Sequence, residues 1–192
     1  GGNVWLDRAK TSPYAFYQYW LNVSDEDAEK FIKVFTFQTQ EQIQTLTEQH
    51  KQAPHLRLLQ KELAKEMTML VHSLEDYESS IEAANILFGE TTFEKINSIP
   101  EASFLSVFEG VPQAKINQID IESGLSVIDL LSAKTGFLKS NGEARRALSE
   151  NSIQINKSKV TEAFIIEKQH LINQKYLIVQ RGKKNFFLVE VV

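Results

Sequence analysis

The residues best suited to bind a ligand lie in the heptapeptide from Ser140 to Arg146, Ser-Asn-Gly-Glu-Ala-Arg-Arg. Ser140 and Glu143 have the spacing of a capping box, which predicts a helix that begins at Ser140, with each side chain accepting a hydrogen bond from the backbone of the other. Arg145 and Arg146 then project outward beside each other. Because a guanidinium group presents a planar fork of donors, two of them on one rigid turn suit phosphate oxygens. The alternative is a capped surface helix with two solvated arginines.

Two further basic segments have the character of turns. Arg181-Gly-Lys-Lys184 lies between two β-like runs, and Gly182 allows a tight hairpin turn that carries three cations. Asn156-Lys157-Ser-Lys159 is a second basic turn between predicted strands. Each turn alone is a common surface feature, but three basic clusters within one small region favour binding to nucleic acid.

The charge distribution divides the chain. Residues 1–110 hold nine Lys and Arg against 17 Asp and Glu, whereas residues 111–192 hold 12 against eight. This asymmetry predicts two units, of which the second binds a polyanion. A solvated basic surface without a partner is the alternative.

No sequence motif indicates catalysis. The chain has no Cys, so a zinc site would need His and carboxylates alone, and His50, His55, His72 and His170 show no metalloprotease spacing. Phosphate-binding glycine motifs and the nucleophile elbow are absent. We therefore predict neither catalytic residues nor a metal. The favoured interpretation of the acidic helix start at Asp25 to Asp27 is that its charge compensates the helix dipole. The alternative is a base-reading site, since carboxylates accept hydrogen bonds from the amino groups of bases.

The sequence pattern of the first half predicts a series of helices. Ser12-Pro13, Ser24 and the Thr39/Gln42 capping box mark three helix starts. Pro54 is expected to begin the longest helix. A further helix ends near Gly89, and two short helical segments follow around residues 93–96 and 102–108.

The second half has a different pattern. One helix around residues 127–131 stops at Gly136, another starts at Ser140, and β-like runs follow at residues 152–155, 164–166, 176–179 and 186–191. The predicted fold class is α+β: an all-helical domain followed by a small α+β RNA-binding domain of two helices and a short-stranded β-sheet. The predicted linker between them covers residues 111–123.

Taken in order, these segments resemble the C-terminal part of bacterial-type tyrosyl-tRNA synthetase. The resemblance covers essentially the whole chain from Gly2, and the run from Thr11 to Asn22 is its most specific part. The remaining matched segments are Gly2–Asp7, Phe35-Thr36, Leu63-Ala64, Glu66–Thr68, Val71-His72, Leu87–Gly89, Ser140 with Glu143–Arg146, Val160 and Arg181–Lys184.

The resemblance implies that different parts of the chain have different roles. Residues 1–20 would be the segment leaving a catalytic domain, residues 21–110 a helical anticodon-binding domain, and residues 124–192 a domain of the fold named after a small-subunit ribosomal protein. The two adenylate-forming signatures of the family are absent, and the start at Gly1-Gly2 without Met is expected of a chain that has lost the preceding domain. ATP and tyrosine would bind that domain, so no cofactor is expected in this chain, which alone is expected to be catalytically inactive.

The expected function is the tRNA-binding portion of a tyrosine–tRNA ligase that positions tRNA(Tyr) through anticodon and variable-arm contacts. The expected localisation is the cytoplasm. The parent enzyme is expected to be a homodimer and this fragment a monomer, and neither a membrane nor DNA is expected as a partner. The candidate RNA-binding residues are Ser140, Glu143, Ala144, Arg145, Arg146, Lys157, Arg181, Lys183 and Lys184. Of these, Glu143 and Ala144 are expected to have a structural role. The spacer Asn141-Gly142 differs from the Lys-containing spacer that is commoner in this motif. In the helical domain, Asp25 and Asp27 are candidate anticodon contacts.

Two alternatives use the same small domain. One is an RNA-modifying or hydrolytic enzyme, which would need a catalytic carboxylate or nucleophile within residues 1–110. The other is a structural or dimerisation module with negligible affinity for RNA.

Overall fold

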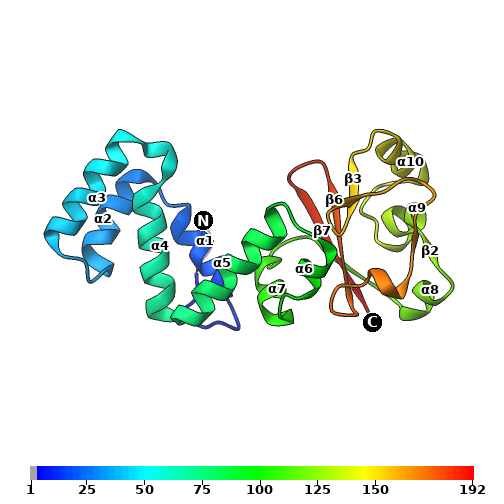
Figure 1. The fold of residues 1–192 in the computed structure, drawn as a ribbon, viewed down its shortest axis with the longest axis horizontal. Helices are drawn as coiled ribbons and strands as arrows, with labels where there is room; N and C mark the ends of the chain where they lie inside the picture. Colours follow the sequence, from blue (N-terminus) through cyan, green and yellow to red (C-terminus); the bar gives the residue numbers. More distant parts are fainter. Residues whose placement is uncertain (1–3) are drawn as a thin grey trace. The chain divides into compact units, whose positions relative to one another are not determined.

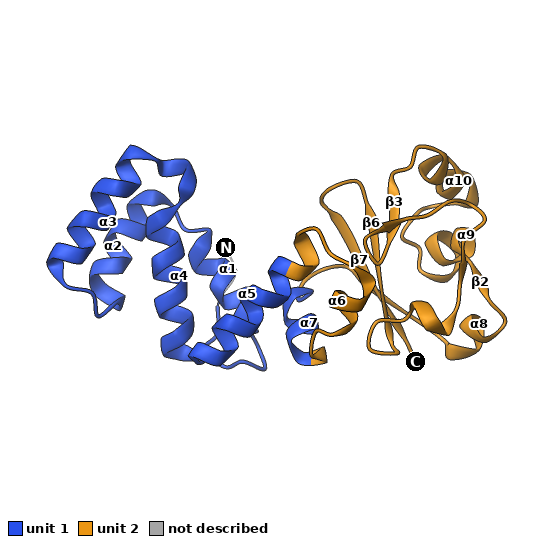
Figure 2. Cartoon of the chain, in the orientation of Figure 1, with its two compact units in different colours: residues 1–85, 102–109 blue, residues 86–101, 110–192 orange. Residues whose placement is uncertain are grey.

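The computed structural model describes residues 4–192, and its helices and small sheets give an α+β fold (Figure 1). The first three residues of the predicted segment 1–20, which include the start of the resemblance at Gly2, lie outside the described residues. The chain forms two compact units (Figure 2): unit 1 comprises residues 1–85 and 102–109, and unit 2 comprises residues 86–101 and 110–192.

Unit 1 is helical. Its elements are α1 (Pro13–Leu21), α2 (Asp25–Phe35), α3 (Gln40–Gln52), α4 (Leu58–Val71), most of α5 (Leu74–Phe88) and most of α7 (Glu101–Val107). The predicted caps are confirmed: the Ser12, Ser24 and Thr39 side chains each accept a backbone N–H of the first turn, and Thr39 and Gln42 form the full capping box. The core is built from the apolar faces of α1, α2 and α4, including Phe16, Ile32 and Leu63.

The prediction that Pro54 begins the longest helix is wrong. Pro54–Leu56 form only a 3-10 turn, η1, and α4 starts at Leu58 after Arg57, whose φ of 53° lies in the left-handed region. That conformation cannot continue a right-handed helix. The longest helix is α5, with 15 residues.

Unit 2 contains a five-stranded sheet of order β1-β7-β6-β3-β4. Its strands are β1 (Gln113–Ile116), β3 (Ile153–Ile155), β4 (Ser158–Lys159), β6 (Tyr176–Arg181) and β7 (Asn185–Val191). All pairings are antiparallel except β1 with β7. The predicted β-like runs around 152–155, 176–179 and 186–191 thus correspond to β3, β6 and β7.

One face of this sheet packs on two helical segments. These are α10 (Asn141–Ser149) and the pair α9 (Val127–Asp129) and η2 (Leu130–Lys134), with Leu131, Ala147 and Val179 in a common core. The helix predicted before Gly136 is present, but its last part, η2, is a π-helical turn. Residues 86–101, which include α6 (Phe93–Asn97), meet the sheet through Phe88 against Phe186 and through a 2.6 Å hydrogen bond from Tyr176 to Glu101. Cover on both faces explains why most of β6 is buried.

Residues 111–123, predicted as a linker, are not an extended connection. They contain β1 and the short helix α8 (Gln118–Glu122) and belong to unit 2. The pattern of β1 is weak because its pairing partner, β7, lies far along the sequence. The functional division into an anticodon-binding and a second RNA-binding domain stays a prediction.

Gly124 is required at the turn before β2 (Leu125–Ser126), which pairs with β5 (Ile165–Ile166). Its φ is 80°, and a Cβ there would lie 2.8 Å from Ile165 Cγ2. Gly124→Ala is therefore expected to lower the free energy of unfolding by about 2–3 kcal/mol, through left-handed strain plus steric overlap. Gly136→Ala, with φ 65° but no atom within 4 Å of its Cβ, is the control. It should cost only about 1 kcal/mol. Urea unfolding of both variants checks this; equal losses would contradict the steric part.

Candidate RNA-binding site

The site is organised by the first turn of α10. Ser140 Oγ accepts from Glu143 N at 3.2 Å, as the spacing predicts. The reciprocal half of the predicted capping box is wrong: Glu143 Oε2 accepts from Lys139 N at 3.0 Å instead of from Ser140. Asn141 accepts a hydrogen bond from Ser132 in the π-helical turn, which fixes the first residue of α10 to η2. The sequence carries no signal for this contact.

Glu143 also joins the two basic clusters. Its Oε1 accepts from Arg181 Nη1 at 2.7 Å, in a half-buried ion pair between α10 and the end of β6. The hydrogen bond from Arg181, and then the one from Lys139 N, hold the pKa of Glu143 below its usual value. A lowered folded pKa means that the pair contributes above the ordinary Glu pKa and is lost as the pH falls through the folded pKa. Glu143 therefore links α10 to the end of β6, next to the basic loop.

The two arginines of α10 lie in different surroundings. Arg145 Nε donates to Glu162 Oε1 at 3.0 Å in an exposed pair. Arg146 is exposed and has no acidic partner among the described residues. Ala144 is fully buried, and its side chain packs in the core of unit 2.

The β6–β7 hairpin presents two more cations. Its loop is Gly182-Lys183-Lys184, with Gly182 at φ 65° as expected. Gln180 Nε2 donates to Gly182 O at 2.8 Å, and Gly182 N donates to Ser152 O at 2.8 Å, so the loop is held from two sides. Lys183 and Lys184 are exposed and form no ion pair within residues 4–192.

Lys157 occupies a separate tight turn. Asn156 and Lys157 form the two-residue loop between β3 and β4, with φ of 48° and 70°, the pattern of a type I′ turn. The Asn156 side chain is buried and bonds His170 O and Ile178 N. Lys157 Nζ lies 5.9 Å from the centroid of the Phe186 ring. Lys157 is thus half-buried and lies near an aromatic ring. Lys139, next to Ser140, is exposed, forms no ion pair within residues 4–192, and was not among the predicted RNA-binding residues.

The candidate anticodon residues differ from each other. Asp25 Oδ1 accepts from Gln60 Nε2 at 2.6 Å and lies 3.1 Å from His50 Nε2, without hydrogen-bond alignment to the histidine. The bond from Gln60 is the main cause that lowers the pKa of Asp25. Asp27 is exposed, its backbone N–H donates to Ser24 Oγ, and its carboxylate forms no hydrogen bond or ion pair within residues 4–192. Asp25 therefore has a fixed orientation and Asp27 does not.

No group of three or more His, Asp or Glu side chains in residues 4–192 is arranged to hold a metal ion. None of the helices in the described part of the chain is long and apolar enough to cross a membrane.

Comparison with known proteins covers both units. Residues 103–189 match the family model described as the tyrosine–tRNA ligase SYY-like C-terminal domain, and residues 1–89 match that of class I tRNA synthetases (W and Y). The tyrosine–tRNA ligase of Flavobacterium psychrophilum is 54% identical over 191 residues, which are 100% of this chain and 44% of the relative. That of Bacteroides thetaiotaomicron is 50% identical over 190 residues, 98% of this chain and 44% of the relative.

A solved structure also matches. The C-terminally truncated mitochondrial tyrosyl-tRNA synthetase of Coccidioides posadasii is 40% identical, with a TM-score of 0.39, over 40% of this chain and 21% of that one. The chain spans less than half the length of the curated relatives it matches.

Proposed function

Because this chain belongs to the tyrosine–tRNA ligase family and matches the C-terminal part of its members, we propose that it binds tRNA(Tyr) and positions it for aminoacylation. One observation carries the proposal beyond family membership. Arg146, Lys183 and Lys184 remain exposed and without an acidic partner among the described residues, while the elements that bear them are fixed by hydrogen bonds.

These cations suit the phosphates of a folded RNA. Arg146 offers a planar fork of donors, and the two lysines offer compact charges on a short loop. The Glu143–Arg181 ion pair joins α10 to the start of that loop, so little backbone order has to be gained on binding. Phosphate contacts supply affinity and register without reading the sequence. This role fits the long variable arm of the tRNA.

Unit 1 is proposed to contact the anticodon. The Asp25 carboxylate is a candidate acceptor for base donors, because Gln60 holds one of its oxygens and the side chain is more than half exposed. ATP and tyrosine are proposed to bind the remainder of the enzyme. We also propose that the parent enzyme is a homodimer in the cytoplasm and that neither DNA nor a membrane is its partner.

A salt titration tests this function. The chain is mixed with tRNA(Tyr) and binding is measured by filter retention between 50 and 300 mM KCl, with light scattering to record the oligomeric state. We expect log K to fall linearly with log salt, by about 0.7–0.9 per phosphate neutralised. Negligible binding at 50 mM KCl by a stable oligomer would instead identify a dimerisation module.

Glu162→Gln is expected to strengthen tRNA binding. The substitution frees Arg145 from its ion pair, so one more guanidinium group reaches phosphate. Since exposed pairs are weak, we expect about 2- to 5-fold tighter binding and a salt slope steeper by roughly 0.7–0.9. The control is Glu150→Gln, an exposed residue with no ion pair among residues 4–192, which changes net charge equally. The same titration measures both; an equal gain in the control would assign the effect to overall charge.

A further inference from the structure

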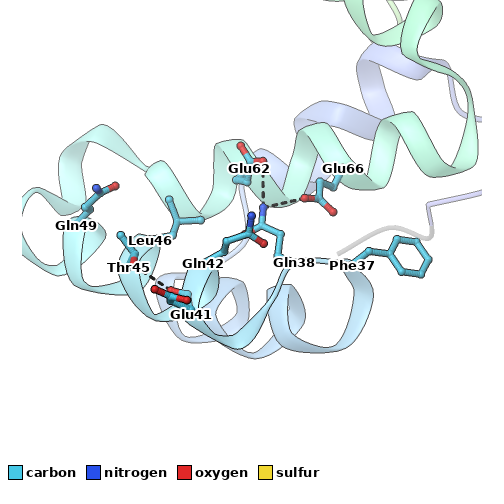
Figure 3. Close-up of a pocket in the computed structure, with 9 residues that line it drawn as sticks. All are labelled: Phe37, Gln38, Glu41, Gln42, Thr45, Leu46, Gln49, Glu62 and Glu66. Carbon is cyan, nitrogen blue, oxygen red and sulfur yellow. Dashed lines mark hydrogen bonds between the residues drawn. The ribbon is translucent and has the colours of Figure 1, made fainter.

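Exposed aromatic rings occur in both units, and the charge around each ring decides whether the backbone of an RNA can approach it. In unit 1, Phe37 lies at the end of a groove between α3 and α4, where Glu62 and Glu66 turn toward Gln38 (Figure 3). No Lys or Arg lines that groove within the described part of the chain, and its carboxylates repel phosphate. In unit 2, by contrast, the surroundings of Phe88 are basic.

Phe88, the last residue of α5, presents a fixed aromatic ring on unit 2. Its ring centroid lies 5.4 Å from that of Phe186 on β7, with an angle of 80° between the two ring planes. This edge-to-face packing holds the ring against the sheet, yet Phe88 is still 46% exposed. A ring that is held on one side and open on the other provides a surface on which a planar base can stack.

A row of cross-strand neighbours extends from this aromatic pair across the sheet. Phe186 pairs with Gln180 on β6, Gln180 pairs with Gln154 on β3, and Gln154 pairs with Lys159 on β4. Directly paired residues point to the same face of a sheet. Their neighbours along β3, β6 and β7 lie in the core beneath α10, so the row occupies the opposite face, against which Phe88 packs.

Cations lie around the aromatic pair and at the far end of the row. Lys157 Nζ is 5.9 Å from the centroid of the Phe186 ring, and the Lys183-Lys184 loop leads directly into β7. None of these lysines, nor Lys159, forms an ion pair within residues 4–192. Neighbouring strands are about 4.8 Å apart, so Lys159 lies roughly 14 Å from Phe186, a distance that suits the phosphate of a flanking nucleotide.

We propose that an unpaired base of the bound tRNA stacks on the exposed face of Phe88, with its flanking phosphates on Lys157 and Lys159. Unpaired nucleotides suit such a site, because their bases can leave the helix and lie on an aromatic ring. Every base has a face that can stack, so the site selects an unpaired nucleotide rather than a sequence. The inference rests on the proposed tRNA binding and deepens it: Arg146 and the hairpin lysines hold the backbone, and Phe88 distinguishes an unpaired nucleotide from a continuous duplex.

Phe88→Leu separates stacking from ionic contacts. Leucine keeps an apolar side chain against Phe186 but has no ring, so the fold should be retained, which urea unfolding checks. Filter binding of the whole chain to tRNA(Tyr) should weaken about 10-fold, within the range found for one base stacked on an aromatic ring. The slope of log K against log salt should stay unchanged, because loss of a ring changes no counterion release. Phe88→Tyr keeps the ring and should bind as tightly as the unsubstituted chain.

Lys157→Gln should show the reverse pattern. Removing one phosphate contact should weaken tRNA(Tyr) binding by only about 3-fold at 50 mM KCl, with a salt slope shallower by roughly 0.7–0.9. The same filter-binding series measures both substitutions. A Phe88→Leu variant with a shallower slope and a Lys157→Gln variant with an unchanged one would contradict the assigned roles.

Two fluorescein-labelled RNA duplexes of about 12 base pairs test the selection directly. One is continuous and the other carries a single bulged adenosine. Fluorescence anisotropy at 50 mM KCl should show about 10-fold tighter binding of the bulged duplex, and Phe88→Leu should remove this preference. The control is Ile119→Ala, an exposed apolar residue on α8 of unit 2, which should leave the preference unchanged.

The outcomes distinguish this site from the proposed function. Equal binding of the two duplexes, or a Phe88→Leu variant that keeps the preference, would overturn the inference while tRNA(Tyr) binding stands. An unsubstituted chain that does not bind tRNA(Tyr) at 50 mM KCl would remove the proposed function and this inference with it. Binding of the acidic peptide acetyl-GEGEG-amide in place of either duplex, lost in Phe88→Leu, would identify a protein partner and overturn the inference as well.

Discussion

Replacing Arg146, Lys183 and Lys184 together by alanine is expected to weaken tRNA(Tyr) binding by about 30- to 150-fold at 50 mM KCl, since each phosphate contact contributes roughly 0.7–1 kcal/mol. The slope of log K against log salt should become shallower by about 2–3, because three fewer counterions are released. All three side chains are exposed, so the fold should be unaffected. Filter binding across a salt series measures both quantities.

A matched triple variant distinguishes position from net charge. Lys95→Ala/Lys115→Ala/Lys168→Ala also removes three cations from unit 2, two of which are already in ion pairs with Glu190 and Glu122. Binding should fall by no more than about 3-fold, because exposed pairs contribute little and these residues lie outside the α10 and β6–β7 site. If both triple variants lose affinity equally, the proposed site is wrong and only the overall charge of unit 2 matters.

Arg57→Ala is expected to lower the free energy of unfolding by about 2–3 kcal/mol. Arg57 Nε and Nη2 donate to Leu21 O at 3.3 and 2.8 Å, and Nη2 also donates to Val23 O at 2.9 Å. These half-buried bonds tie the turn between α1 and α2 to the start of α4. Charged donors to carbonyl groups are each worth about 1.5–3 kcal/mol, reduced here by partial exposure.

Backbone strain adds a second, separable contribution at this position. Arg57 has a φ of 53°, which alanine tolerates poorly and glycine readily. Arg57→Gly loses the same hydrogen bonds but relieves the left-handed strain, so it should be more stable than Arg57→Ala by roughly 0.5–1 kcal/mol. Urea unfolding of the two variants measures the difference. A loss below about 0.5 kcal/mol in both would show that the turn does not depend on Arg57.

Features that depend on contacts between residues close in the sequence were predicted correctly. Ser12, Ser24, Thr39 and Ser140 cap their helices as expected, because a cap involves residues only two or three positions apart. The α+β class and the β6–β7 hairpin followed from periodicity and turn residues in the same way.

The differences come from contacts between distant residues. The Glu143–Arg181 pair spans 38 positions, so the sequence did not show that Arg181, a predicted RNA-binding residue, is also an ion-pair partner of α10. Pro54 is a good first residue for a helix, but Arg57, three positions later, is left-handed and is held by tertiary hydrogen bonds to Leu21 O and Val23 O. The weak pattern of residues 111–123 concealed β1 because its hydrogen bonds go to a strand more than 70 residues later. RNA contact by the candidate residues stays a prediction.

The parallel pairing of β1 with β7 has a consequence for synthesis on the ribosome. β7 is the last strand in chain order, yet it lies between β1 and β6 in the sheet. β1 therefore leaves the exit tunnel long before its partner exists, and β7 is the only strand it pairs with in the described residues. The β3–β4 and β6–β7 hairpins can form as soon as they emerge, but closure across β1 is a late, long-range step and should be slow. An unpaired edge in the nascent chain is open to other strands, so this interval is when the growing polypeptide is most exposed to misassembly.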